Sequence, residues 1–573
     1  MSQQDPLELS RRHFFESWAL VLGGGALLGG ELTAADAAAG ASLETAGKVP
    51  LNAQSLKAAA SVVGIDLSAE ELEQAVRGVQ RQRDRFQERR SRGYFANGAA
   101  PALRFDPLLP GRKLGAQANS VSLRSASVPP LPNSDEGIAF SPVTHLSTWV
   151  KEGQISSERL TRIYLNRLKT YDPQLHCVVT LTEELALRQA RRADEEIARG
   201  HYRGPLHGIP WGAKDLLDTK GIHTTWGAMP FKDRVADEDA FVVKRLEEAG
   251  AVLVAKLTLG ALAMGDVWFD EVTRNPFNLE QGSSGSSAGS ASATAAGLVG
   301  FSIGTETLGS IVSPSMRCGT TGLRPTFGRV ARTGAMALCW SLDKIGPICR
   351  TVEDTVLVLS AINGADAGDP SSREHGFAYH GRQSLSGLKV GYSPALFKGE
   401  EREIDRRALS ALRDTGVEMV EVALPEEPYG SLYNILNVEA AAAFEELTRE
   451  GLDDLLVRQT DNAWPNLFRQ SWFVPAIEFV QADRLRRQVM ENMEAVMNQV
   501  DAVISPSFGG NYLIATNFTG HPSLTLRAGF RDNGTPSGVT LWGQLFEEGK
   551  LCRIGEALER ELGVWQRRPK LEL

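Results

Sequence analysis

The chain of 573 residues contains 42% hydrophobic and 23% charged residues, which is ordinary usage for a globular protein. Its formal net charge is −9, and this acidic balance disfavours a nucleic-acid partner, because such proteins neutralise phosphates with a basic face. The five cysteines are scattered without a C-x-x-C pair, and the nine histidines form no H-E-x-x-H motif. We therefore expect no disulfide framework, no metal site and no cofactor.

The N-terminal segment, 1–39, has the order of an export signal. Arg11 and Arg12 precede an apolar stretch at 18–30, and small residues with A-x-A sites follow it. Paired arginines ahead of a mild, glycine-rich apolar core resemble a twin-arginine signal, which exports folded proteins in bacteria. The stretch is too short to cross a bilayer as a helix. The sequence therefore predicts a periplasmic or secreted protein without stable membrane insertion. A tail with a chance arginine pair is the alternative.

Residues 40–142 are predicted to form a helical extension followed by a connector. The segment 51–93 has helical periodicity, and Ser68 with Glu71 is typical of a capping box at the start of a helix. From 101 to 142 the chain is rich in Pro, Ser, Gly and Asn, which indicates an extended connector.

The main domain is predicted to span 143–573. Helical segments such as 156–169 and 185–199 alternate with short apolar runs such as 251–255 and 298–303. Alternation of this kind indicates an α/β layer structure with a mixed sheet.

The most informative segment is a tract of Ser, Gly and Ala at 282–297. Small residues allow backbones to approach closely and to adopt unusual torsions, which a loop that carries a reactive serine needs. A second small-residue loop ends in Gly309 and Ser310, and successive backbone N–H groups in such a loop can converge on one oxyanion. Upstream, Lys214 follows an apolar approach and precedes an aspartate.

These three segments resemble the amidase signature family, whose members carry a G-G-S-S-G-G-S-A tract, a later T-G-G-S loop and a G-x-P-x-x-x-K-D lysine. The stretch 284–291 matches the tract without gaps. The resemblance therefore implies Ser310 as nucleophile, Ser286 as proton relay and Lys214 as base. The interval between the two serines is the family's own, whereas starting from Ser283 would lengthen it by three residues.

The resemblance extends from about 143 to 562 and implies an α/β amidase-signature fold, with a central mixed β-sheet covered on both faces by helices. It also implies a cis peptide bond between Gly285 and Ser286. By family position, substrate contacts are expected near Met264 and Trp268. The oxyanion candidates are the backbone N–H groups of four successive residues, Thr307, Leu308, Gly309 and Ser310.

The chain departs from the family pattern at several positions. Ser284 and Ala288 replace glycines of the tract, Glu306 replaces a usual Asp, and Leu308 replaces the first Gly of T-G-G-S. The side chain at 308 narrows the predicted oxyanion loop and can alter the substrate range. All three catalytic residue types are retained, so we expect an active enzyme.

The residue types define the predicted chemistry. A serine hydroxyl needs a neighbouring base, and lysine is a base only when neutral, so burial must lower its pKa from the reference value of about 10.4. We expect hydrolysis of the C–N bond of a small-molecule carboxamide through an acyl-enzyme on Ser310. Esters and carbamates are further candidate substrates, and a homodimer is left open.

Three alternatives remain. The stretch 285–289 matches the G-x-S-x-G elbow of α/β-hydrolases, with Ser287 as nucleophile, but that elbow follows a strand and the preceding segment here is polar. A glutaminase-type component of a tRNA-dependent amidotransferase is a second, although the predicted export signal conflicts with work on cytosolic RNA. The third is a catalytically silent binding protein on an amidase scaffold, which retention of the catalytic residues argues against.

Overall fold

The computed structural model describes residues 50–124, 127–269, 271–398 and 402–572. The predicted export signal lies outside these residues. The described chain forms two compact units, which divide after Ser91.

The described part of the first unit, 50–91, contains two helices, α3 (Ala53–Val63) and α4 (Ala69–Arg90). Each begins with a capping box, in which the N-cap side chain, Asn52 or Ser68, exchanges hydrogen bonds with the residue three positions later. The capping box predicted at Ser68 is therefore present.

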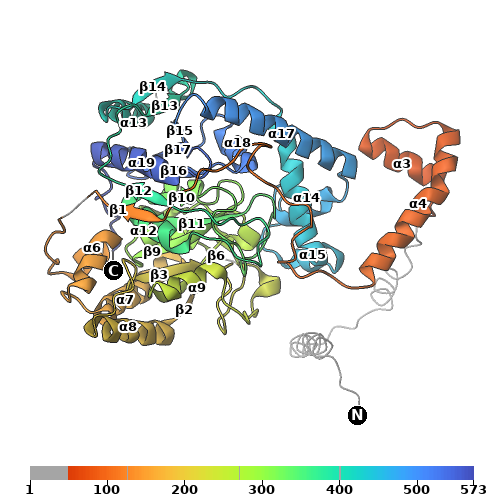
Figure 1. Cartoon of the computed structure of the whole chain (residues 1–573). Helices are drawn as coiled ribbons and strands as arrows, with labels where there is room; N and C mark the ends of the chain where they lie inside the picture. Colours follow the sequence, from red (N-terminus) through yellow and green to blue (C-terminus); the bar gives the residue numbers. More distant parts are fainter. Residues whose placement is uncertain (1–49, 125–126, 270, 399–401, 573) are drawn as a thin grey trace, which may run out of the picture. The chain divides into compact units, whose positions relative to one another are not determined.

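The second unit is built on an 11-stranded mixed sheet (Figure 1). In spatial order its strands are β14 (Glu418–Glu421), β13 (Lys389–Tyr392), β15 (Ala502–Pro506), β17 (Pro536–Gly543), β16 (Ser523–Phe530), β10 (Thr321–Arg324), β11 (Lys344–Cys349), β9 (Phe301–Glu306), β3 (Pro210–Lys214), β4 (Val252–Leu257) and β2 (Val178–Leu181). β3 runs parallel to both of its neighbours, whereas β9, β11, β10, β16, β17 and β15 are successively antiparallel. Every residue of β3, β4, β9, β10, β11 and β15 is buried, which requires cover on both faces of the sheet.

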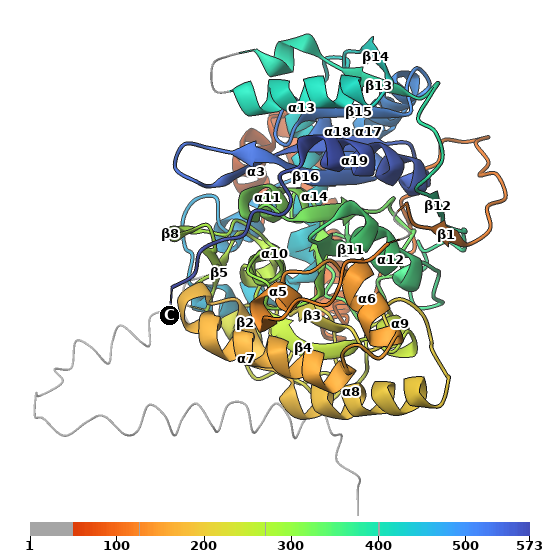
Figure 2. The ribbon, with the colours of Figure 1, turned by 90° about the vertical axis from the view of Figure 1, so that its left-hand side faces the viewer.

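Two groups of helices provide this cover (Figure 2). In the first, neighbouring helices pack on one another and on the sheet: α7 (Ser157–Leu175), α8 (Glu183–Ala198), α10 (Ala288–Ala295) and α11 (Val312–Cys318). The second comprises α6 (Val143–Lys151), α9 (Phe241–Glu248), α12 (Val352–Ile362), α13 (Glu403–Asp414) and α19 (Glu548–Leu562). The predicted α/β fold, a central mixed sheet covered on both faces by helices, is confirmed.

A further layer of helices packs together beside the sheet. It contains α14 (Tyr433–Ala443), α15 (Glu445–Arg449), α16 (Trp464–Ser471), α17 (Ala476–Met497) and α18 (Tyr512–Thr519).

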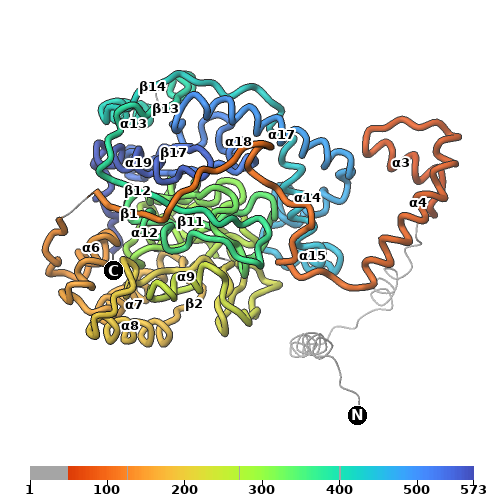
Figure 3. The backbone as a smooth tube through the Cα atoms, viewed as in Figure 1, coloured from red at the N-terminus to blue at the C-terminus, as the bar shows by residue number. Residues whose placement is uncertain are grey.

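The connector belongs to the second unit and runs along its surface (Figure 3). Just before the connector, Asn97 exchanges two hydrogen bonds with the backbone of Ala337, at 2.7 and 2.9 Å. β1 (Ser120–Ser122) pairs in parallel with β12 (Ala378–His380). The prediction of an extended connector missed one short helix, α5 (Asp135–Ala139), which has a serine as its N-cap residue.

All five cysteines are buried free thiols. No helix in the described ranges is long and apolar enough to cross a membrane. The same residues contain no cluster of three or more His, Cys, Asp or Glu side chains that could hold a metal ion.

Candidate active site

Lys214 is the last residue of β3, and its ammonium group is fully buried among hydroxyls. Its Nζ lies 2.8 Å from Ser286 Oγ, 3.0 Å from Ser287 Oγ and 2.8 Å from Thr305 Oγ1. All of these partners are uncharged. Burial therefore lowers the pKa of Lys214 to about 7, although two acidic residues farther away act in the opposite direction.

Asp215 follows Lys214 in the sequence but pairs with a different lysine. Lys256 of β4 places its Nζ 3.0 Å from Asp215 Oδ1, and both side chains are fully buried. The other carboxylate oxygen accepts hydrogen bonds from the N–H and hydroxyl of Thr225, at 2.8 and 2.6 Å. The carboxylate nearest to Lys214 in sequence therefore does not hold it in the charged form. The sequence signal that we missed is a second lysine inside the apolar run of β4.

The first serine loop lies between β8 (Asn278–Gly282) and α10. Its peptide bond between Gly285 and Ser286 is cis, as the family resemblance implies. A Cβ atom at Gly285 would lie 1.9 Å from the carbonyl oxygen of Gly265, so the loop can pass this turn only with glycine at that position. The small-residue tract is therefore needed for close backbone packing as well as for its serines.

Ser286 and Ser287 both reach Lys214, but their other hydrogen bonds differ. The Ser287 hydroxyl donates to the carbonyl of Thr305 at 3.1 Å and accepts from the N–H of the same residue at 3.1 Å. The Ser286 hydroxyl has Lys214 as its only partner in the described chain. Ser286 thus keeps the free hydrogen-bonding capacity that a proton relay needs. Ser287 is fully buried, and its hydroxyl makes two hydrogen bonds to Thr305. It is therefore unsuited to be the nucleophile of a G-x-S-x-G elbow of the α/β-hydrolase type.

Ser310 lies in the second loop, between β9 and α11. The backbone N–H of Ser287 donates to the carbonyl of Ser310 at 3.2 Å, which joins the two serine loops. The exposed fraction of the residue is 0% for Lys214, 1% for Ser286 and 8% for Ser310. Of these three predicted catalytic residues, Ser310 is therefore the most accessible to a substrate. Between the hydroxyls of Ser286 and Ser310, both described, the structure has no hydrogen bond. Such contacts often tighten only when substrate is bound.

The loop from 307 to 310 presents a row of backbone donors. Its four N–H groups donate to no acceptor among the described residues, whereas the next two, of Ile311 and Val312, donate to Glu306 at 2.7 and 2.9 Å. Gly309 has φ 89°, in the left-handed region that favours glycine. The arrangement suits an oxyanion hole, in which preorganised N–H groups bind developing negative charge.

Glu306 anchors this loop from inside the core. Its carboxylate also accepts hydrogen bonds from Arg324 at 2.6 Å and Asn517 at 2.9 Å, and all three side chains are fully buried. Burial alone would raise the pKa of Glu306, but Arg324 and the N–H of Val312 lower it to about 2. Glu306, which the sequence showed only as a departure from the family pattern, is therefore the charged support of the loop that carries Ser310.

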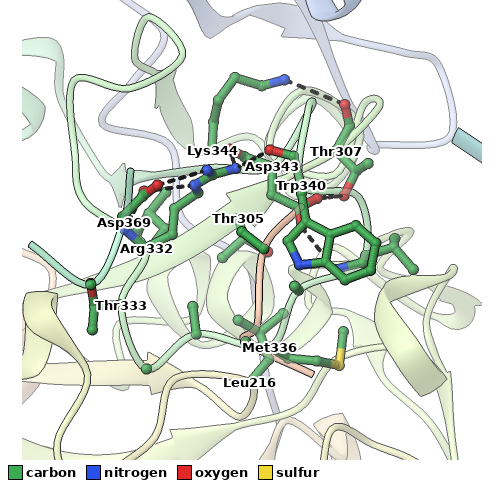
Figure 4. A pocket seen from close by; sticks show the side chains of 18 of the residues that line it. Leu216, Thr305, Thr307, Arg332, Thr333, Met336, Trp340, Asp343, Lys344 and Asp369 are labelled. Carbon is green, nitrogen blue, oxygen red and sulfur yellow. Dashed lines mark hydrogen bonds and ion pairs between the residues drawn. The ribbon is translucent and has the colours of Figure 1, made fainter. Parts of the chain in front are cut away.

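A cavity of about 220 Å³ adjoins the end of β9 and the start of the second serine loop (Figure 4). Thr305 and Thr307 line it, whereas Ser286 and Ser310 do not. Its wall combines apolar and charged side chains, among them Leu216, Met336, Trp340, Arg332, Asp343, Lys344 and Asp369.

Two neighbouring residues in this wall hold Thr307. Asp343 Oδ1 accepts a hydrogen bond from the Thr307 hydroxyl at 2.6 Å, and Lys344 Nζ donates to the Thr307 carbonyl at 3.4 Å. Fixing the side chain and the carbonyl of Thr307 orients the peptide that supplies the next N–H of the loop.

Met264 and Trp268, the predicted substrate contacts, are half-buried on a segment that packs against the serine tract. Asp266, between them, accepts a hydrogen bond from the N–H of Ser284 at 2.8 Å. Neither Met264 nor Trp268 lines the 220 Å³ cavity. Their role in binding substrate stays a prediction.

Comparison with known proteins identifies the family. The family model described as Amidase matches residues 159–552, which is more than half of the chain. The chain belongs to the amidase family. This amidase is 33% identical over 471 residues to a glutamyl-tRNA(Gln) amidotransferase subunit of Desulforapulum autotrophicum, covering 71% of this chain and 94% of that protein.

Solved structures agree with this assignment. The native peptide amidase of Stenotrophomonas maltophilia superposes with a TM-score of 0.68 at 30% identity, covering 75% of this amidase and 98% of that chain. A glutamyl-tRNA(Gln) amidotransferase subunit of Thermotoga maritima gives a TM-score of 0.61 at 27% identity, covering 74% of this amidase and 95% of that chain. The chain is therefore an enzyme that acts on amide C–N bonds.

Proposed function

We propose that the chain hydrolyses a small carboxamide through an acyl-enzyme on Ser310, with Ser286 as proton relay and Lys214 as base. One observation carries the proposal. Lys214, a buried lysine with a pKa near 7, contacts the hydroxyl of Ser286. Of the two described serines that contact this lysine, Ser286 is the one whose hydroxyl has no other hydrogen-bond partner, and it lies beside the loop of the more exposed Ser310.

The reaction follows from these positions. The Ser310 hydroxyl oxygen attacks the amide carbon, its proton passes to the Ser286 oxygen, and the Ser286 proton passes to Lys214 Nζ. The N–H groups of 307–310 bind the oxyanion of the tetrahedral intermediate. The C–N bond then breaks while the relay returns a proton to the departing nitrogen. Water, deprotonated by the same relay, hydrolyses the acyl ester and releases the acid. This is a histidine-free variant of serine acyl transfer.

A second candidate function rests on the relatives. Two thirds or more of the chain aligns with proteins named as subunits of glutamyl-tRNA(Gln) amidotransferase. A protein of that kind would need its partner subunits for full activity, whereas a free-standing amidase would not.

The deciding experiment uses the purified chain without partners. We expect release of ammonia or amine from at least one member of a panel of aliphatic, aromatic, peptide and glutamine amides. We also expect an acyl adduct on the peptide that contains Ser310, detected by mass spectrometry after acid quenching. Turnover seen only with added amidotransferase partners would support the second candidate. Failure to react with a serine-directed fluorophosphonate would instead indicate a catalytically silent binding protein.

Light scattering on the same preparation tests for a homodimer.

Export through the twin-arginine route is a separate proposal, supported by the order of charged, apolar and small residues at 1–39. Replacing Arg11 and Arg12 by Lys should retain the protein in the cytoplasm, because the pathway reads the arginine pair rather than its charge. Fractionation of cells that express the native chain and the double variant measures this. Normal export of the variant, or a cytoplasmic native chain, would show that the signal was misread.

A further inference from the structure

A second cavity, of about 410 Å³, lies apart from the catalytic residues, none of which lines it. It touches Ala295 at the end of α10, Gly319 just after α11, and the segment 565–568 that follows α19. Within the described residues its wall contains no Asp or Glu but four arginines, Arg350, Arg527, Arg567 and Arg568.

Arg350 and Arg527 are the buried pair, with exposed fractions of 9% and 7%. Arg350 donates to the carbonyls of Val299 at 2.8 Å and Ser141 at 2.7 Å, and Arg527 donates to the carbonyl of Arg567 at 2.9 Å. Each also keeps a buried Nε–H without an acceptor in the described chain. Carbonyls satisfy hydrogen bonds but carry no net charge, so both guanidinium charges remain uncompensated by these contacts.

Arg567 and Arg568 form the outer pair. Their guanidinium groups stack on the rings of Phe530, at 3.9 Å, and Phe140, at 4.8 Å. Neither side chain makes a hydrogen bond or ion pair to any residue in the described ranges. Stacking fixes the plane of a guanidinium while its N–H edge remains available to a ligand.

The nearby carboxylates compensate these charges only in part. The carboxyl group of Asp354 interacts electrostatically with Arg350, and that of Glu559 with Arg527. Burial raises the pKa of Asp354 to about 6 and that of Glu559 to about 8, so Glu559 is mostly neutral at pH 7. None of the four arginines forms an ion pair with a described residue. Buried charge without a counter-charge is costly, and a bound anion would remove that cost.

We propose that this cavity binds a phosphate or sulfate group of a small soluble anion. Guanidinium groups bind tetrahedral oxyanions through paired, charge-assisted hydrogen bonds, and the exposed Arg567 and Arg568, whose side chains have no hydrogen-bond partner among the described residues, can offer such pairs. The C-terminus of α10 alone would repel an anion, but Arg350 donates to the Thr294 carbonyl at 3.4 Å and offsets it. A volume of about 410 Å³ also leaves room for the rest of a phosphorylated molecule.

Isothermal titration calorimetry on the whole chain tests the site. Inorganic phosphate and glycerol 3-phosphate are titrated separately into protein in chloride buffer at matched ionic strength. We expect saturable binding of phosphate, and tighter binding of glycerol 3-phosphate if the natural ligand is a phosphomonoester. The Arg567→Gln/Arg568→Gln variant should weaken phosphate binding by about tenfold or more, because it removes both free guanidinium edges.

The matched control is Arg188→Gln/Arg199→Gln, on and just after α8, which removes the same charge from side chains that are 63% and 76% exposed. It should bind phosphate like the native chain. Equal weakening in both variants, or no saturable phosphate binding by the native chain, overturns the proposal. Melting curves in chloride confirm that each variant folds. Ser310→Ala should bind phosphate normally, so failure of this site and failure of the proposed amidase mechanism are separable.

Discussion

Replacing Ser310 by Ala should reduce amide turnover by about 10⁴-fold or more, because loss of the nucleophile leaves only binding and oxyanion stabilisation. The acyl adduct should disappear from the mass spectrum. Ser286→Ala should cost about 10²-fold, since a positioned proton-transfer group is worth roughly that much and water can partly replace a hydroxyl. The measurement is kcat/KM for the best amide of the panel, with melting temperature to show that both variants fold.

Neighbouring serines of the tract supply the controls. The Ser283 hydroxyl donates to the carbonyl of Ser284, and the Ser284 hydroxyl contacts that of Ser313 at 2.5 Å, so neither is bonded to Lys214. Ser284 has φ 60°, where glycine is favoured, so Ser284→Gly should fold well. Ser283→Ala and Ser284→Gly should both keep most activity. Loss of turnover in Ser283→Ala but not in Ser286→Ala would mean that our alignment of the serine tract with the family motif is shifted by three residues.

The local pattern of apolar and polar residues was sufficient to predict many of the strands and helices of this fold. Continuous apolar runs at 251–255 and 298–303 predicted strands that the structure contains as β4 and β9, each displaced toward the C-terminus by one to three residues. Amphipathic spacing at 156–169 and 185–199 likewise predicted α7 and α8. Strand and helix periodicities are properties of a few consecutive residues, so they can be read without knowing what the element packs against.

The charged supports of the site could not be read in this way. Glu306 meets Asn517 across 211 positions of sequence and Arg324 across 18, and each of these charged or polar groups is stable in the core only because the others are there. The buried ion pair of Asp215 and Lys256 likewise depends on both charges being present. No local periodicity encodes which buried charge will find which partner. Sequence reasoning therefore identified the candidate reacting groups but missed the residues that hold them.

Activity should depend on pH through the protonation of Lys214. Only the neutral amine can accept the proton, so kcat/KM should fall as the pH is lowered through about 7 and level off above it. Lys214→Ala should lose about 10²- to 10⁴-fold in turnover. Lys214→Arg should do no better, because guanidinium stays protonated at every working pH. Recovery of activity in the arginine variant at high pH would contradict the role of base.

The same lowered pKa should be visible in stability, independently of catalysis. The folded chain releases the Lys214 proton near pH 7, whereas the unfolded chain holds it up to about 10.5. Between these values the unfolded state binds more protons, so this group makes the free energy of unfolding increase with pH. Lys214→Met keeps the buried volume but lacks the proton. The difference in unfolding free energy, native minus variant, should therefore rise from about pH 7 toward 10.5, measured by urea denaturation at several pH values. A difference that stays flat over this window would mean that burial does not lower the lysine pKa, and the base would have to be sought elsewhere.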